Sequence, residues 1–297
     1  MTILITGSNG LVGSHLVRYF CLNSQAEIFA TSFSQNRLQA LQGFEFHQVD
    51  ICQKEHVDAL INKIKPNVIF HCAAISQVDL CEKDPELCYQ VNVVGTRNLL
   101  TAAQKVNSKF IFYSTDFVFS GNKGSDYTEA DSKDPISIYG ESKAQAEDEI
   151  IETYEDFTII RPILIYGTSP SVSRGNIIKW VKSSLAKNQS IAVVDDQYRQ
   201  PTSIQSLVQL SASILEKDVQ GIFHAAGAEQ LSVYQFAKKT AEFYGLDGSL
   251  VSPISSQKLN ETGKRPAKTW FDLKKSKEIL NFIPHDVKEG LENFEKF

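Results

Sequence analysis

The sequence predicts an α/β fold: a doubly wound parallel sheet, with a smaller α/β part toward the C-terminus. Three observations support this prediction. Short apolar runs alternate with amphipathic stretches through the first half, a glycine-rich turn directly follows the first run, and the alternation loosens after Arg161. Apolar strands separated by helices pair in parallel, and right-handed crossovers then place helices on both faces of the sheet.

Six short, mainly apolar runs in the first half are expected to be strands: Thr2–Thr6, Glu27–Thr31, Phe44–Val49, Val68–His71, Lys109–Tyr113 and Phe157–Arg161. Apolar residues at helical spacing between these runs predict four helices: Leu11–Cys21, Lys54–Ile64, Pro85–Val106 and Tyr139–Thr153. Each of these helices therefore connects two strands of one sheet.

The second half contains fewer strands and more polar segments. Tyr166–Gly175 is rich in Gly, Ser and Pro and is expected to be a loop. The elements predicted after it are a helix, a strand, an amphipathic helix and a strand: Asn176–Lys187, Ile191–Val194, Ser203–Lys217 and Gly221–Ala225. We expect the last two to return to the main sheet. The main domain then comprises residues 1–165, rejoined by about 195–226, and the smaller part comprises 166–194 and 227–297.

The composition indicates a globular protein of about two domains, or one large domain with an attachment. Its 30 basic and 35 acidic side chains leave no basic excess for binding nucleic acid. The five cysteines form no C-x-x-C pair, which is typical of reduced cytoplasmic thiols and gives no zinc-ligand spacing. No apolar run reaches the ~18 residues of a membrane span, and the N-terminus lacks a basic signal-peptide start. We therefore expect a cytoplasmic protein without a metal, membrane or nucleic-acid partner.

A G-x-x-G-x-x-G turn joins the first predicted strand to the first helix. It consists of Gly7, Ser8, Asn9, Gly10, Leu11, Val12 and Gly13. Glycines let the backbone turn tightly and approach a pyrophosphate, which the free N–H groups of the helix N-terminus can bind. This position between a strand and a helix predicts a dinucleotide-binding, Rossmann-type domain.

The end of the second strand indicates which dinucleotide is bound. A carboxylate there normally holds the ribose 2′-hydroxyl of NAD, but Ser32 and then Arg37 stand in this region. A hydroxyl and a guanidinium can bind a 2′-phosphate instead, so NADPH is expected, with NADH as the open alternative. Asp50 and Ile51 close the third strand, where the adenine is expected. Ala73 and Ala74 follow the fourth strand and leave room for the cofactor.

Tyr139 and Lys143 form a Y-x-x-x-K pair at the start of a predicted helix. This spacing places the phenol and the ammonium on one face, and a nearby Lys favours phenolate and is expected to lower the tyrosine pKa. Such a phenol exchanges a proton with a carbonyl or alcohol oxygen. Thr115 ends the fifth strand, and its hydroxyl is expected to hydrogen-bond the same oxygen.

Together, these motifs resemble an extended short-chain dehydrogenase/reductase over essentially the whole chain. Within that superfamily, the sequence is most similar to the dTDP-4-dehydrorhamnose reductase family. The segments that carry this second resemblance are Ala74–Pro85, Tyr113–Gly121, Tyr139–Lys143 and Asp195–Tyr198 with Pro201 and Thr202.

The resemblance implies a role for each matching residue. Gly10, Leu11 and Val12 meet the pyrophosphate. Tyr139 is the proton donor, and Lys143 binds the nicotinamide ribose and tunes Tyr139. Further implied contacts with the cofactor are Ser32, Asp50, Ile51, Ala74, Ile75, Ser76 and Tyr113. Implied contacts with the sugar or its nucleotide phosphates are Thr115, Asp116, Asn176 and Arg265.

Two departures from related patterns bear on the reaction. Family members often carry Arg-Thr-Ser-Trp after the sixth strand, whereas this chain has Arg161-Pro162-Ile163-Leu164, which resembles the epimerase side of the superfamily. Sugar 4,6-dehydratases carry Asp-Glu after the Thr, whereas Phe117 follows Asp116 here. The pair of acids for dehydration is therefore broken.

The resemblance implies an NADP(H)-dependent reductase of a nucleotide-linked 4-keto sugar, acting as a homodimer. Two alternatives remain open. A nucleotide-sugar epimerase uses the same Thr, Tyr and Lys. The NADP-binding regulatory subunit of methionine adenosyltransferase also resembles this family and serves a partner enzyme.

Overall fold

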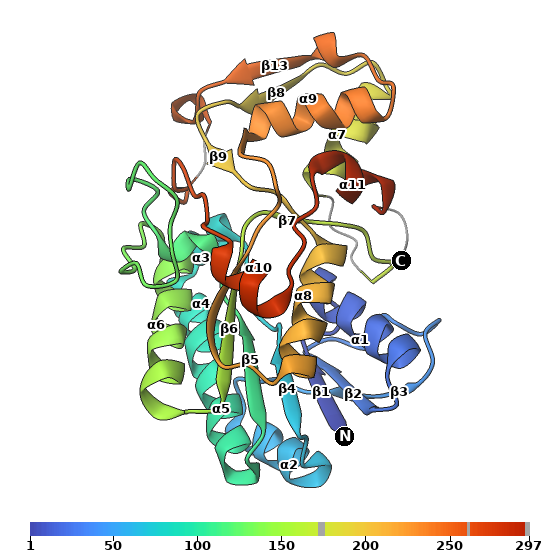
Figure 1. Cartoon of the computed structure of the whole chain (residues 1–297), viewed down its shortest axis with the longest axis vertical. Helices are drawn as coiled ribbons and strands as arrows, with labels where there is room; N and C mark the ends of the chain where they lie inside the picture. Colours follow the sequence, from blue (N-terminus) through green and yellow to red (C-terminus); the bar gives the residue numbers. More distant parts are fainter. Residues whose placement is uncertain (172–175, 260–261, 295–297) are drawn as a thin grey trace.

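The computed structural model describes residues 1–171, 176–259 and 262–294. Its centre is a seven-stranded, all-parallel sheet with the strand order β11-β6-β5-β4-β1-β2-β3 (Figure 1). The strands are β1 Thr2–Thr6, β2 Glu27–Ser32, β3 Phe44–Gln48, β4 Val68–His71, β5 Lys109–Tyr113, β6 Phe157–Pro162 and β11 Gly221–Ala225. The six strands expected in the first half are confirmed within one residue at each end.

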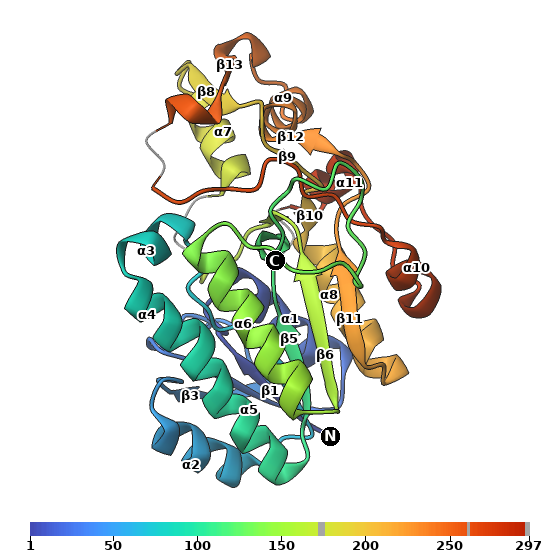
Figure 2. The same ribbon diagram turned by 90° about the vertical axis from the view of Figure 1, so that its left-hand side faces the viewer.

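Helices cover both faces of this sheet, as a doubly wound fold requires. The helices α1 (Leu11–Asn23) and α8 (Ile204–Lys217) lie on one face, and a large apolar cluster fills the space beneath them. The helices α2 (Lys54–Ile64), α5 (Gly95–Val106) and α6 (Ile138–Thr153) cover the other face over a second cluster. Figure 2 shows α4, α5 and α6 side by side on that second face.

The predicted helix Pro85–Val106 is interrupted by a π-helical turn. The structure divides it into α4 (Pro85–Tyr89), the π-turn Gln90–Val94 and α5. The amide of Asn92 bonds both the backbone N–H and the carbonyl of Ile75, at 2.8 and 3.0 Å, and Thr96 Oγ1 donates to the Asn92 carbonyl. Side chains that insert into the local hydrogen-bond pattern are a common cause of such turns.

The elements that return from the second half complete the sheet. β11 pairs with β6 in parallel, and α8 packs against α1. The sequence predicted that β11 and α8 return to the main sheet, because Gly221–Ala225 is a short apolar run preceded by an amphipathic helix. The last short helix of the sheet side, α10 (Lys274–Leu280), packs against α8 and β11.

The smaller part lies beyond the carboxyl ends of the strands (Figure 1). Its helices α7 (Ile177–Leu185) and α9 (Val233–Phe243) pack on a parallel strand pair, β8 (Ile191–Val194) and β13 (Val251–Ile254).

The remaining elements of the two parts are short: β7 Ile165–Tyr166, β9 Tyr198–Arg199, β10 Thr202–Ser203, β12 Leu231–Ser232, α3 Val78–Lys83 and α11 Val287–Glu292, with 3₁₀ turns at Asp116–Val118, Gly248–Leu250 and Ser256–Lys258. The expected loop Tyr166–Gly175 begins within β7, and its residues 172–175 lie outside the described residues.

The strand order reverses between β1 and β4, which places a crevice at the carboxyl ends of these two strands. Within the three described ranges, no helix is both long and apolar enough to cross a membrane. The fold thus directs attention to the edge where β1, β2, β4 and β5 end.

Candidate functional site

The glycine turn after β1 is shaped by close backbone contacts. Gly7 has φ +64°, and a Cβ on Gly13 would lie 2.4 Å from the Gly7 carbonyl oxygen. Gly10 precedes α1 without any side-chain cap, so the first N–H groups of a 13-residue helix stay available. Only glycine can occupy positions 7 and 13 without a change in the backbone of the turn. The turn therefore forms a cradle suited to a pyrophosphate.

A cavity of about 710 Å³ opens beside this turn. Eight residues expected to bind the cofactor line it: Gly7, Gly10, Ser32, Asp50, Ile51, Ala73, Ala74 and Ile75. Others were not anticipated, among them Phe33, Cys52, Gln53, Leu87 and Gln90. Leu87 of α4 and Gln90 of the π-turn were not predicted to line the cavity, because no local sequence pattern shows that this part of the helix faces the crevice. Size, position and the glycine cradle fit a nicotinamide dinucleotide.

A neighbouring cavity of about 550 Å³ includes Arg37 and Ser34 in its wall. Asn9 forms hydrogen bonds with the loop that makes this wall. Its Oδ1 accepts from the Arg37 N–H at 3.0 Å, and its Nδ2 donates to Ser34 Oγ at 3.0 Å. Asn9 therefore holds the loop after β2, in which the Arg37 side chain is exposed. This arrangement suits a phosphate on the ribose 2′-position.

The predicted catalytic residues Thr115, Tyr139 and Lys143 are brought together at the end of β5. Ser137 caps α6 by accepting from the Gly140 N–H at 3.1 Å, which starts the helix one residue before Tyr139. All three side chains are buried. Phe117 packs its ring against that of Tyr139, with centroids 5.6 Å apart, at the position where a dehydratase carries its acid.

The expectation that Lys143 lowers the pKa of Tyr139 is wrong, because the pKa of this phenol is raised. Burial raises the pKa of Tyr139, and its hydrogen bond with Thr115 opposes this only partly. Burial also lowers the pKa of Lys143 to about 7, although Glu147, Cys72 and Cys88 act in the opposite direction. The Lys143 Nζ lies 3.8 Å from the centroid of the Phe112 ring. The sequence spacing identifies Tyr139 and Lys143 as a pair, but only the packed structure shows how strongly the two groups are removed from water.

The shifted pKa of Lys143 predicts how stability depends on pH. Between about pH 7 and pH 10, the unfolded chain holds a proton on this amine that the folded protein lacks, so stability rises with pH. We expect the free energy of unfolding to rise more steeply from about pH 7 to pH 9 in the wild type than in Lys143→Met. Urea unfolding at several pH values checks this, and parallel curves for the two proteins would contradict it.

A buried ion pair anchors the catalytic helix to the sheet. Glu147 on α6 accepts from Arg161 Nε at 3.0 Å and from Nη2 at 2.6 Å, and neither side chain is more than 2 % exposed. The Lys133 ammonium lies 3.4 Å from the same carboxylate. Because Arg161 belongs to β6, this bidentate contact fixes the face of α6 that carries Tyr139 and Lys143.

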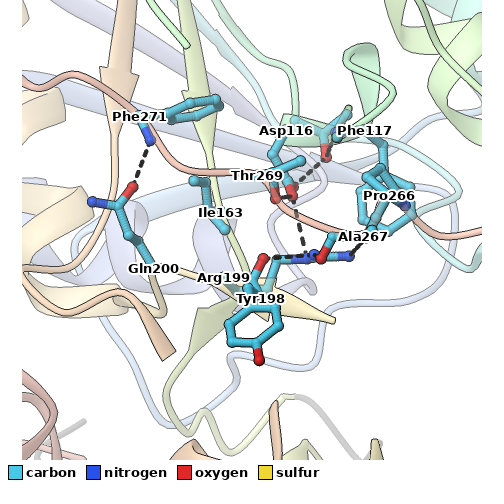
Figure 3. A network of polar contacts seen from close by, with 12 residues as sticks. Asp116, Phe117, Ile163, Tyr198, Arg199, Gln200, Pro266, Ala267, Thr269 and Phe271 are labelled. Carbon is cyan, nitrogen blue, oxygen red and sulfur yellow. Dashed lines mark hydrogen bonds and ion pairs between the residues drawn. The ribbon is translucent and has the colours of Figure 1, made fainter. Parts of the chain in front are cut away.

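Asp116 lies in a polar network that joins the main sheet to the smaller part (Figure 3). Its carboxylate accepts from Thr115 Oγ1 at 3.2 Å and from Thr269 Oγ1 at 2.5 Å, and Arg199 Nε is 3.5 Å away. Arg199 also donates to the carbonyls of Pro266 and Tyr198, both at 2.7 Å. Burial raises the pKa of Asp116, and Arg199 opposes that rise. In this structure Asp116 thus positions Thr115 from inside the network.

Arg199 and Thr269 were not predicted as site residues. The available signal was the position of Arg199 directly after the segment Asp195–Tyr198, whereas its burial is known only from the structure. Gln200, the next residue, accepts from the Phe271 N–H at 2.6 Å and extends the network along the same segment (Figure 3).

Four other expected contacts have different surroundings in the structure. The Tyr113 hydroxyl pairs with Ser211 of α8 at 2.5 Å within the core, and Ser76 is exposed. Asn176 caps α7 by accepting from the Lys179 N–H at 3.0 Å, and Arg265 pairs with Asp79 of α3 at 2.9 Å. Tyr113, Asn176 and Arg265 therefore have structural partners within the protein. Within the described ranges, no group of three or more His, Cys, Asp or Glu residues could hold a metal ion.

Comparison with known proteins gives consistent results. A family model described as the RmlD substrate binding domain matches residues 1–296. The chain is 31 % identical to a dTDP-4-dehydrorhamnose reductase of Aggregatibacter actinomycetemcomitans, covering 99 % of this chain and 98 % of that protein. It is 29 % identical to methionine adenosyltransferase 2 subunit beta of Xenopus laevis, covering 92 % and 80 %. The structure superposes on dTDP-4-dehydrorhamnose reductase from Bacillus anthracis in complex with NADP with a TM-score of 0.84, at 27 % identity and 99 % and 98 % coverage.

Proposed function

The chain belongs to the RmlD substrate binding domain family, and we propose that it is an NADPH-dependent reductase of a dTDP-linked 4-keto sugar, dTDP-4-dehydrorhamnose in particular. The observation that carries this proposal is the shared edge of the sheet. The cavity beside the glycine cradle is linked to the catalytic residues through its own wall: Ile75 packs against the apolar cluster that contains Tyr139, and Cys72 interacts with the charge of Lys143. The reductase relatives, one of them in complex with NADP, support the same reaction.

In this proposal Tyr139, Lys143 and Thr115 each have a separate role in the reduction. NADPH supplies the hydride when it is bound in the main cavity. Tyr139 donates a proton to the sugar oxygen, for which the raised pKa keeps the phenol protonated at neutral pH. The phenolate that remains favours the protonated form of Lys143, whose ammonium then stabilises it. Thr115 turns its one hydroxyl proton from Asp116 to the developing alkoxide. Phe117 leaves no acid beside them for dehydration.

We further propose that residues 166–194 and 227–297 bind the sugar nucleotide. In this proposal Arg265 exchanges its partner Asp79 for a nucleotide phosphate, and Asn176, at the start of α7, makes a second contact with the sugar nucleotide. A homodimer and a cytoplasmic location stay predictions. The mass of the purified protein in solution tests the first of these.

Turnover tests the proposed reaction. Purified protein is mixed with NADPH and dTDP-4-dehydro-6-deoxy-L-mannose, and loss of the nicotinamide absorbance is followed. We expect continuous NADPH consumption with one sugar reduced per cofactor oxidised. Tightly held NAD⁺ without net consumption would favour an epimerase. No turnover, together with capture of a methionine adenosyltransferase catalytic subunit, would favour the regulatory role suggested by the relative from Xenopus laevis.

The choice of cofactor gives a separate prediction. We expect NADPH to bind at least about tenfold more tightly than NADH, which corresponds to ~1.4 kcal/mol, because Ser32 and Arg37 replace a carboxylate. Arg37→Ala should narrow this difference while leaving NADH affinity unchanged, since NADH lacks the 2′-phosphate. Isothermal titration with both cofactors measures the two affinities. Equal affinities in the wild type would overturn the assignment.

A further inference from the structure

Two thiols that the proposed mechanism leaves unused lie in contact beside the catalytic helix. Cys81 on α3 and Cys88 on α4 have their Sγ atoms 2.7 Å apart, and both side chains are 0 % exposed. Together with Val78 and Tyr139 they form one apolar cluster. All five cysteines of the chain are free, and these two are the buried ones.

The surroundings make the two sulfurs unequal. Asn92 Nδ2 donates to Cys88 Sγ at 3.4 Å, and Ser142 Oγ lies 3.5 Å from the same sulfur. The hydrogen bond with Cys81 lowers the pKa of Cys88 against the effect of burial, and Ser142, Asn92 and the Lys143 charge lower it further. The same contact raises the pKa of Cys81. Cys88 is therefore the better nucleophile, and Cys81 retains its proton.

Both thiols adjoin residues that line cavities. Cys81 Sγ lies 3.7 Å from the carbonyl of Ile75, which borders the cofactor cavity. Ser142, beside Cys88, borders another cavity of about 280 Å³. A water molecule occupies only ~30 Å³ in the liquid, so an oxidant of nearly that size fits within either cavity and there lies one residue away from the buried thiols. We expect a bulky oxidant such as glutathione disulfide to be excluded from the buried pair.

We propose that Cys81 and Cys88 form a dithiol that hydrogen peroxide oxidises to a disulfide, and that this bond slows the enzyme. The Cys88 thiolate attacks one peroxide oxygen, the O–O bond breaks, and the leaving hydroxide takes up a proton to become water. Cys81 sulfur then attacks the sulfenic sulfur of Cys88, and the displaced hydroxide leaves as water with the Cys81 proton. Two thiols lose two electrons in total, and one peroxide gains them.

The effect on the reaction follows from the contacts of Cys88. Asn92 Nδ2 also donates to Ser142 Oγ at 2.9 Å, and Ser142 Oγ donates to the Tyr139 carbonyl at 2.8 Å. Pulling Cys88 toward Cys81 disturbs this chain of hydrogen bonds at the residue that delivers the proton. Since small displacements of reacting groups are costly, we expect kcat to fall by about tenfold.

Mass spectrometry and turnover test the proposal on the intact protein. After treatment with hydrogen peroxide, we expect two fewer titratable thiols than the five of the reduced protein. Trypsin cleaves at Lys83, between the two cysteines, so the disulfide should link two separate peptides under non-reducing conditions. Dithiothreitol should restore both the thiols and kcat. Glutathione disulfide should leave both unchanged.

Matched variants separate this pair from the other thiols. Cys81→Ala and Cys88→Ala should each abolish the cross-link and the peroxide-induced loss of kcat that dithiothreitol reverses. Cys52→Ala and Cys72→Ala remove thiols near the cofactor cavity and should still form the cross-link. A cross-link through Cys72, no cross-link at all, or a Cys81–Cys88 disulfide that leaves kcat unchanged would each overturn the proposal.

Discussion

Replacing Tyr139 by Phe should slow turnover of the keto sugar by about 100-fold or more, the usual contribution of a positioned general acid. The substitution removes only the hydroxyl, and the ring keeps its packing against Phe117. NADPH affinity should therefore stay within about twofold of the wild type. Steady-state turnover with NADPH and dTDP-4-dehydro-6-deoxy-L-mannose, together with a direct cofactor titration, measures both quantities.

Tyr154→Phe is the matched control for this variant. Tyr154 directly follows the same helix, and its hydroxyl donates to the Ser108 carbonyl at 2.7 Å, away from Thr115 and Lys143. Its loss should cost some stability but leave the turnover rate unchanged. Full activity in Tyr139→Phe, or an equal loss of activity in both variants, would remove Tyr139 from the role of proton donor.

Glu147→Gln should destabilise the folded protein by about 3–5 kcal/mol, because it leaves the Arg161 guanidinium buried without its countercharge. Burial pushes the pKa of Glu147 up, but the hydrogen bonds and charge of Arg161 outweigh this and hold it below the usual value. The stabilisation is therefore present above the ordinary carboxyl pKa and is lost as the pH falls through the lowered one. Chemical denaturation at neutral pH measures the difference.

The same helix provides a control for this second result. Glu149 pairs with Arg97 at the surface, where the Arg97 side chain is 47 % exposed. Glu149→Gln should therefore cost less than about 1 kcal/mol. A similar change in both variants would show that the buried pair contributes no more than a surface contact. Because α6 carries Tyr139, a large loss in Glu147→Gln should also weaken catalysis at temperatures below unfolding.

The elements that sequence reasoning located best are those set by local periodicity. Lys109–Tyr113 and Lys54–Ile64 have the predicted bounds because a buried strand and an amphipathic helix differ in the spacing of their apolar residues. The π-turn at Gln90–Val94 was not predicted, because it is associated with a hydrogen bond between the Asn92 side chain and the distant backbone of Ile75. The glycine turn was identifiable because its spacing follows from the backbone geometry itself.

The limits at the site have the same origin. The pair Tyr139 and Lys143 is apparent from its spacing, whereas the desolvation that dominates their pKa values arises from residues packed around them. The partnership of Arg265 with Asp79 joins residues 186 positions apart, and no local pattern indicates it. Arg199 likewise reaches Asp116 from a distant part of the chain.

The late return of β11 to the sheet bears on how the protein is made. β6 is the edge strand of the sheet until residues 221–225 have been synthesised, because β11 is its outer neighbour. A growing chain on the ribosome therefore exposes an unpaired strand from the time β6 leaves the exit tunnel until β11 has also left it. Such edges template association with other chains, so release of a prematurely terminated product should favour aggregation. Binding of a chaperone to nascent chains should then be strongest before residue 225 leaves the exit tunnel.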